Sequence, residues 1–405
     1  MYGQLLRAVQ DGDADDLRRL CNDFITDISV TPLNPGNTPA PVEVACKNGN
    51  TELVKIFLEN GCSPNLPTSK GRLIHTVLDS MKSGAINLRE GRDLISFMIK
   101  KDLQLSMVDI KGDSPLQLVA ELGDVETLEI IIEHSPAKHQ CERSIGSGFI
   151  PLHTSVMRGD LDCVDRLLRR YPAKFINLCD QNGETALNHS LKMIRNNVKY
   201  LRTDNGVICL EQNPDQLRLF GHQCKFVGIM EMLLSMGAEP NSLYFENNFD
   251  TSRRQQSMLP LCIALSILSM YEMRYVHKVE PATLDLEKTE DYMNLYQSIL
   301  QTSEEFLNLY KSVVRLLVLW GAKLEKTSRV YYKNLFANCP IVQNLIDEVF
   351  DYWSFVRFTK NKPKKLGHLC RQIIRTRLRQ TKSLHSIDSL PLPANLKEYV
   401  KLNYF

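Results

Sequence analysis

The feature that most constrains the fold is an internal repeat, which is clear at three places in the chain. The copies open at residues 40–43 (Ala-Pro-Val-Glu), 114–117 (Ser-Pro-Leu-Gln) and 150–153 (Ile-Pro-Leu-His). In each copy 20 positions separate the opening proline from the residue that closes the unit, and the last two copies begin 36 residues apart. Repeats of this length are typical of solenoids, in which each unit buries its apolar face only against its neighbours. We therefore expect a chain built from stacked units.

Each copy predicts a pair of helices joined by a short turn. The proline begins the first helix at a position where its missing N–H costs nothing, and Gly49, Gly123 and Gly159 permit a left-handed turn between the helices. The openings, together with the endings at residues 61–65 (Gly-Cys-Ser-Pro-Asn) and 237–241 (Gly-Ala-Glu-Pro-Asn), resemble the ankyrin repeat, with its T-P-L-H-x-A opening and G-A-D-P-N-like end. The resemblance implies an all-α ankyrin-repeat solenoid.

The pattern divides the chain into four regions. Residues 1–35 resemble an N-terminal capping unit, and about six repeats are expected over residues 36–324. A closing helix at residues 342–358 and a linker are expected within residues 325–364. Residues 365–405 form a separate small unit, which we expect to be largely helical.

Extra residues interrupt the repeats near 81–92, 195–225 and 269–305. Such insertions are tolerated because the entropy of closing a surface loop rises only slowly with its length. The insertion at 195–225 is polar and is expected to form a loop. The one at 269–305 carries aliphatic and aromatic side chains, so part of it is expected to be helical.

The last forty or so residues begin with an amphipathic helix whose apolar positions follow the helical period. The stretch that follows contains two prolines, which fix φ and remove N–H donors, so it is expected to be extended. About forty residues without a disulfide or a metal motif are near the lower limit for independent folding. Because each buried aliphatic side chain contributes roughly 1.5–3 kcal/mol, another polypeptide is expected to cover this apolar stripe, which consists of Leu366, Leu369, Cys370, Ile373, Ile374 and Leu378.

At these residues the chain resembles the SOCS box. Its elongin-binding part has a small residue or proline, then leucine, cysteine and an aliphatic residue at fixed spacing; Leu366, Cys370 and Ile374 match, whereas Lys365 departs from the first position. Its cullin-binding core, Leu-Pro-aliphatic-Pro, is matched in full at residues 390–393. The resemblance implies that elongin C contacts Leu366, Leu369, Cys370, Ile373 and Ile374, and that a cullin contacts Leu390, Pro391, Leu392 and Pro393.

Ankyrin repeats followed by a SOCS box resemble the ankyrin repeat and SOCS box family. The resemblance implies a non-catalytic substrate-recognition subunit of an elongin B/C–cullin-5 E3 ubiquitin ligase with a RING subunit, whose repeats bind a protein substrate of unknown identity. The alternative is an ankyrin scaffold that sequesters a partner without ubiquitylation. A third hypothesis, a nuclear regulator, rests only on the basic residues 360–365.

Composition narrows the remaining classes. A net charge of +2 argues against a nucleic-acid or membrane-surface role for the whole chain, and no apolar run reaches the length of a membrane span. The eleven cysteines contain no C-x-x-C pair and the chain carries no signal peptide, so we expect free thiols and a cytoplasmic location, with the nucleus as second compartment. No metal-ligand spacing or phosphate-loop motif is found, so no metal or cofactor is expected.

Individual reactive side chains receive structural interpretations. His75, His153 and His189 lie in or near repeat openings, where an imidazole usually bonds within the turn. Cys163 and Cys179 are interpreted as small buried hydrophobes. Ten Lys and Arg residues without Asp or Glu at residues 352–387 are interpreted as the solvated face of the terminal helix, with nuclear import as the alternative.

Overall fold

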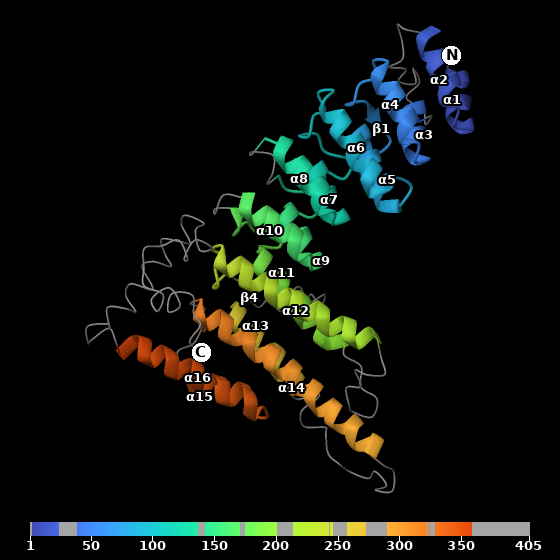
Figure 1. Cartoon of the computed structure of the whole chain (residues 1–405). Helices are drawn as coiled ribbons and strands as arrows, with labels where there is room; N and C mark the ends of the chain where they lie inside the picture. The colour runs from blue at the N-terminus through green and yellow to red at the C-terminus, as the bar shows by residue number, and fades with distance from the viewer. Residues whose placement is uncertain are drawn as a thin grey trace, which may run out of the picture. The chain divides into compact units, whose positions relative to one another are not determined.

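The computed structural model describes residues 2–23, 39–136, 142–170, 175–200, 214–242, 244–245, 257–272, 290–320, 322, 324 and 329–358. The chain forms two compact units, Met1–Tyr171 and Pro172–Phe405. Each is described by itself (Figure 1).

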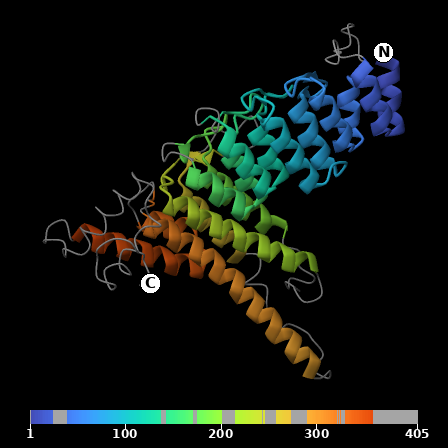
Figure 2. The same cartoon turned by 45° about the horizontal axis from the view of Figure 1, so that its top comes forward.

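The first unit stacks helix pairs in two layers (Figures 1 and 2). The first helices of successive pairs pack on one another, and so do the second helices, with each pair also packed internally. A small antiparallel hairpin, β1 (Pro67–Thr68) and β2 (Gly71–Arg72), precedes the third pair, with Pro67 opposite Arg72. The helices are α1 (Tyr2–Asp11), α2 (Ala14–Asp23), α3 (Pro41–Lys47), α4 (Thr51–Glu59), α5 (Leu73–Ser83), α6 (Leu88–Ile99), α7 (Pro115–Leu122), α8 (Val125–His134), α9 (Pro151–Arg158) and α10 (Leu161–Arg170).

Local sequence signals explain where these helices begin and end. A proline occupies the first turn of α3, α7 and α9, and Ser114 Oγ accepts the backbone N–H of Gln117 to cap α7. Gly123 ends α7 at φ 77°, in the left-handed region that favours glycine. At Gly49 (φ +80°) an added Cβ would lie 2.2 Å from the backbone oxygen of Ala85, so the neighbouring repeat also requires glycine there.

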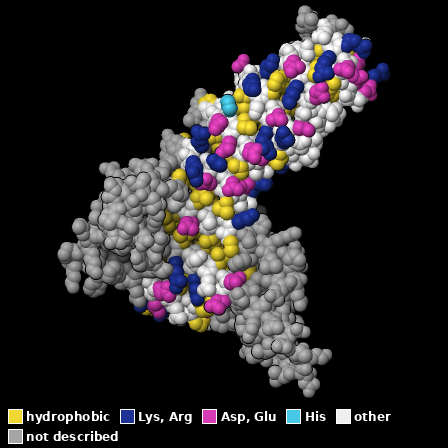
Figure 3. Space-filling model, viewed as in Figure 1, with side chains coloured by type: hydrophobic (Ala, Val, Ile, Leu, Met, Phe, Trp, Pro, Cys, Tyr) yellow, Lys and Arg dark blue, Asp and Glu magenta, His cyan; other side chains and the backbone are white. Residues whose placement is uncertain are grey.

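The core of this unit runs between the layers and is almost wholly aliphatic. Each second helix contributes side chains that are almost fully buried, such as Leu53 and Val54 of α4, Leu94 and Ile95 of α6, and Leu128 and Ile131 of α8. Outside the core, ion pairs connect consecutive second helices, for example Arg166 with Glu129 at 2.7 Å. Figure 3 shows the two signs of charge interspersed over this face. Exposed pairs of this kind stabilise by only about 0–1 kcal/mol each, so the core carries the stacking.

The second unit is also helical, with one short hairpin. Helix α11 packs on α12 and α13, and α13 packs on α14 and α16. At the centre lie Tyr271, Phe306 and Tyr310, all fully buried, with 5.0 Å between the ring centroids of the two tyrosines. The elements are α11 (Ala186–Tyr200), α12 (Pro214–Ser235), β3 (Tyr244–Phe245), β4 (Ser257–Met258), α13 (Pro260–Tyr271), α14 (Glu290–Leu319), α15 (Arg329–Leu335) and α16 (Pro340–Phe358).

The insertions are helical to a greater extent than predicted. Near residues 81–92 the extra residues lengthen α5 and α6 to 11 and 12 residues, compared with 8 and 10 for α7 and α8. The expected loop at 195–225 is wrong at both ends, because α11 continues to Tyr200 and α12 begins at Pro214. Polar composition misled the prediction, since Lys, Arg and Gln favour helices as well as solvent. The partly helical insertion at 269–305 is confirmed by α14, which begins at Glu290.

The closing helix is confirmed as α16, which begins at Pro340. The short helix α15 precedes it and was not predicted within residues 325–364. No described helix in either unit is both long and apolar enough to cross a membrane.

A buried carboxylate holds the N-terminus of α16. Glu272, at the end of α13, is fully buried, and its two carboxylate oxygens accept the backbone N–H groups of Ile341 at 2.7 Å and Val342 at 3.0 Å. These are among the N–H groups that a helix cannot satisfy internally, and a negative charge at this end also opposes the helix dipole. Glu272 therefore ties the closing helix to the repeat before it.

We expect Glu272→Ala to lower the free energy of unfolding by about 1–3 kcal/mol, because it leaves two buried donors without an acceptor. Urea unfolding of the full chain, followed by circular dichroism, measures the loss. Glu231→Ala is the control, since Glu231 is exposed on α12. Equal stability of the two variants would contradict this role for Glu272.

Candidate functional site

The residues predicted to bind the ligase lie outside the described residues, which end at Phe358. Their assignment therefore stays a prediction. The elongin set is Leu366, Leu369, Cys370, Ile373 and Ile374, and the cullin set is Leu390, Pro391, Leu392 and Pro393.

What the structure does describe is the support for that segment. Helix α16 buries Val342, Leu345, Ile346 and Val349, so its first three turns belong to the core of the second unit. It ends at Phe358, eight residues before Leu366. The predicted ligase-binding segment is thus connected by a short stretch of chain to a firmly packed helix.

The histidines of the repeat openings have structural roles. His153 Nδ1 accepts the backbone N–H of Ile150 at 3.2 Å, and His75 Nδ1 accepts that of Arg72 at 3.0 Å. The Nε2 atom of His75 lies 3.2 Å from the backbone oxygen of Met107. Burial lowers the pKa of His75, against the opposing effect of Asp109, so this ring is neutral at pH 7. Both rings fix turns, as predicted.

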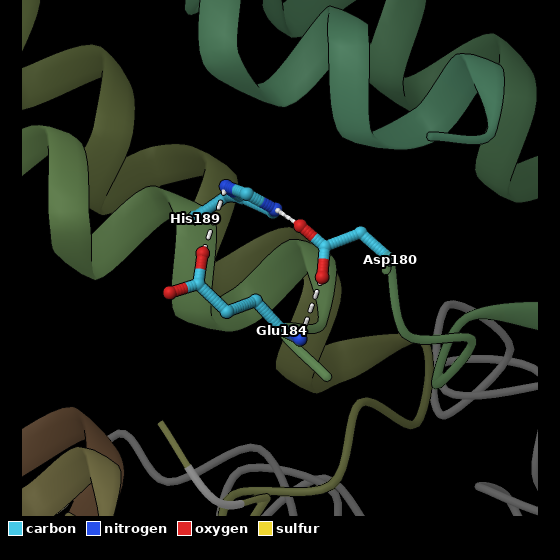
Figure 4. A group of neighbouring side chains, drawn as sticks. All are labelled: Asp180, Glu184 and His189. Carbon is cyan, nitrogen blue, oxygen red and sulfur yellow. Dashed lines mark hydrogen bonds and ion pairs between the residues drawn. The ribbon is translucent and has the colours of Figure 1, made fainter. Parts of the chain in front are cut away.

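The repeat that opens at α11 departs from this arrangement. Asn188 occupies the position of the usual histidine, and His189 follows it. The ring of His189 lies between two carboxylates (Figure 4): Nε2 is 3.1 Å from Asp180 Oδ2, and Nδ1 is 3.7 Å from Glu184 Oε2. The side chains of Asp180 and Glu184 are fully buried, and only 4% of the His189 side chain is exposed.

The charges of this cluster are compensated from several sides. Burial alone would raise the pKa of Asp180, but the hydrogen bond from His189 and those from the backbone N–H groups of Glu184 and Asn182 outweigh it and lower the pKa to about 2. Lys192 Nζ lies 3.0 Å from Glu184 Oε2. The cluster is therefore a buried ion network with its charges paired.

The same three side chains are of the types that bind metal ions, and their ligand atoms lie within 4.8 Å of one another. Their geometry does not fit a single ion, however. The two ring nitrogens of His189 face different carboxylates, so an ion beside one nitrogen would lose the carboxylate that faces the other. The ammonium of Lys192 also holds Glu184. We interpret the cluster as a device that fixes the turn before α11.

The cysteines that were interpreted as buried hydrophobes behave differently from each other. Cys163 is fully buried, and burial raises the pKa of its thiol, so it is unreactive, as predicted. The prediction is wrong for Cys179, which is partly exposed. Cys179 lies in the turn region before α11, where it forms an isolated bridge with Thr185 and its Sγ lies 3.8 Å from the backbone oxygen of Asn177.

Sequence analysis singled out His189 but missed its partners Asp180 and Glu184. The signal was present: the segment Asp-x-x-Gly-Glu precedes a helix whose histidine is displaced by one position. Two exposed aliphatic residues at turns of the first unit, Ile110 and Ile145, were missed as well. Each stands beside a Gly-containing turn, where a polar residue is the usual choice.

Protein-family models match three parts of the chain. A model of the SOCS box matches residues 362–401, one of three ankyrin repeats matches residues 116–213, and one of a single ankyrin repeat matches residues 36–69. The predicted combination of ankyrin repeats and a SOCS box, and with it the all-α repeat fold, is confirmed.

Curated relatives are similar to parts of the chain only. Tyrosine-protein kinase HTK16 of Hydra vulgaris is 28% identical over 127 residues, and the nuclear factor NF-kappa-B p105 subunit of Gallus gallus is 25% identical over 169 residues. These matches cover 31% and 39% of this chain but 16% of each relative. The solved ankyrin repeat domain of Bcl-3, a member of the IkappaB protein family, is 18% identical with a TM-score of 0.42, over 59% of this chain and 88% of that one.

The low pKa of Asp180 makes the stability of the second unit depend on pH. Because the pKa is about 2 in the folded state and near 3.8 in an unfolded chain, the ionised group stabilises the fold above pH 4, and this stabilisation is lost as the pH falls toward 2. We expect Asp180→Asn to lower the free energy of unfolding by about 2 kcal/mol at pH 7 and by much less near pH 2.5. Urea unfolding at both pH values tests this, with Glu231→Gln as control; a pH-independent loss would contradict it.

Proposed function

We propose that this chain, which has the ankyrin repeats and the SOCS box of the ankyrin repeat and SOCS box family, is a substrate receptor of a cullin–RING ubiquitin ligase containing elongin B, elongin C and cullin-5. The observation that carries the proposal is the presence of both parts in one chain, repeats at 36–69 and 116–213 and a SOCS box at 362–401. One part binds a protein, and the other recruits the ligase.

Elongin C is the proposed partner of the amphipathic stripe. Leu366, Cys370 and Ile374 recur at intervals of four residues, which places them on one face of a helix. A helix of this kind docks in an apolar groove through side chains at such intervals. Elongin B then enters the complex through elongin C.

The cullin is proposed to contact the extended stretch formed by Leu390, Pro391, Leu392 and Pro393. Two prolines hold this stretch extended before binding, so little conformational entropy is lost when it docks. The Leu-Pro-Leu-Pro sequence is the feature that favours cullin-5, and a RING subunit completes the ligase.

The chain itself performs no chemistry in this proposal. The repeats hold the substrate near a charged ubiquitin-conjugating enzyme, and the gain comes from effective concentration. The described part of the chain contains buried thiols and paired carboxylates rather than an exposed nucleophile beside a base. We propose a cytoplasmic location, with the nucleus as the second compartment.

The alternative is a scaffold that sequesters its partner without ubiquitylation. Such a scaffold has no use for the SOCS box at 362–401. The two hypotheses differ in one observable: only a receptor binds elongins.

We expect Leu366→Ala combined with Cys370→Ala to weaken elongin C binding by about a hundredfold or more, because two apolar side chains leave the docked face. Co-purification of the full chain with elongins B and C measures this. The matched control is Arg371→Ala with Arg375→Ala, on the solvated side of the same predicted helix. Undiminished elongin in the first variant would contradict the assignment.

Replacing residues 390–393 with alanine is expected to abolish cullin-5 binding while elongins B and C still co-purify. The two docking segments are separate, so one can be removed without the other. Quantitative immunoblotting of the purified complexes measures both partners. Loss of the elongins together with cullin-5 would show that the two segments do not act independently.

A further inference from the structure

The first unit presents two isoleucines to solvent at neighbouring turns. Ile110 and Ile145 are 70% and 72% exposed, and Val108 is 40% exposed. Six large hydrophobic side chains are this exposed among the described residues, and three of them lie here. We call the surface formed by Val108, Ile110 and Ile145 the turn-tip surface.

Contacts between turns make this surface continuous. The backbone N–H of Ile110 donates to the oxygen of Lys70 in the preceding turn at 3.4 Å. On its other side, a Cβ added to Gly112 would meet the side chain of Ile145 at 2.5 Å, so Ile145 lies directly over this glycine. The tips of successive turns therefore touch, and the exposed aliphatic side chains stand close together.

The turns are held without help from these side chains. Asp109 Oδ1 accepts the backbone N–H groups of Lys111 and Asp113, both at 2.8 Å, and the N–H of Gly112 donates to the oxygen of Asp109 at 3.1 Å. In the next turn the N–H of Ser144 donates to the oxygen of Phe149 at 2.8 Å. Asp109 and the glycines thus determine the turn geometry, and the fold does not require an aliphatic side chain at either tip.

The charges around the surface are arranged unequally. The carboxylate of Asp109 is engaged in its own turn, and that of Asp113 bonds to Ser144. Both are half-buried, whereas the cations Lys111 and Arg143 beside the isoleucines are exposed. A ligand that approaches therefore meets aliphatic side chains flanked by positive charge.

We propose that the turn-tip surface is the substrate-docking site of the first unit and that it takes a peptide segment in which apolar side chains are flanked by Asp or Glu. Burial of the apolar side chains against Ile110 and Ile145 supplies most of the affinity. Attraction to Lys111 and Arg143 accelerates association and selects acidic segments. Because the turns are already fixed, little entropy is lost on binding. The proposal deepens the receptor function above and rests on it for the meaning of the bound segment.

The test selects peptides from a random twelve-residue phage library on the full chain in complex with elongins B and C. Selected peptides are synthesised, and their dissociation constants are measured by fluorescence polarisation. We expect apolar residues together with Asp or Glu in the selected sequences, and weaker binding at 500 mM than at 50 mM NaCl. Selected peptides that lack acidic residues overturn the proposal, as does failure to select any peptide.

The decisive variant is Ile110→Ser with Ile145→Ser, which should weaken peptide binding at least tenfold. Lys111→Glu with Arg143→Glu should weaken it less and remove the salt dependence. The matched control is Val330→Ser with Leu335→Ser, the same kind of change at side chains that are 65% and 59% exposed on α15. Equal affinity of the wild type and the double isoleucine variant overturns the proposal.

Two further measurements separate this proposal from its neighbours. All variants should melt within about 2 °C of the wild type, because the changed side chains are exposed; a second pair, Ile110→Thr with Ile145→Thr, keeps the branched shape if the serine pair is less stable, and should also bind more weakly. Elongin co-purification is recorded in parallel, so its loss with peptide binding intact counts against the receptor function alone. Light scattering that shows a dimer dissociated by the isoleucine changes would assign the surface to a second copy of this chain and overturn the proposal.

Discussion

The fold depends on the fact that a pair of short helices cannot bury its own apolar face. Helices of 8 to 10 residues, such as α7 and α8, have too few core positions to be stable alone. They become stable because Leu116, Leu128 and Ile131 are covered by the preceding and following pairs. The tight turns between helices, of which that at Gly49 lies against Ala85 of the next repeat, allow the layers to approach this closely. The exposed turn tips follow from the same stacking, because it places them side by side.

Stacking leaves an end that has no next neighbour, and the second unit shows how that end is closed. Helix α13 is buried along most of its length and covers its neighbours, while α16 covers α13 in turn. Glu272 fixes the start of α16 through two backbone bonds, and Ser269 contacts Cys339 at 3.0 Å in the same place. Because this end is closed by the chain itself, the ligase-binding segment beyond it is not needed to complete the solenoid and is available to partners.

Sequence reasoning succeeded where a residue acts within its own turn. The prolines of the openings, the glycines between helices and the histidines at 75 and 153 all have local tasks, so their spacing alone predicted their positions. It failed where contacts join distant residues. Glu272 reaches Ile341 across 69 positions, and nothing in the sequence near either residue indicates the bond. The polar stretch after Arg195 was assigned to a loop because composition reports exposure but not hydrogen bonding. The ligase-binding residues, from Leu366 to Pro393, rest on motif spacing alone.

The placement of apolar side chains separates two kinds of binding in one chain. The terminal stripe is amphipathic, so its helix and its partner contact depend on each other, and the ordering of the helix reduces the net affinity. The turn tips differ, because Asp109 and the backbone bonds fix them whether or not a ligand is bound. A preformed surface can discriminate among segments by charge at Lys111 and Arg143 without reshaping. A receptor that must choose a substrate needs such a rigid surface, whereas a segment with one constant partner can afford to order on binding.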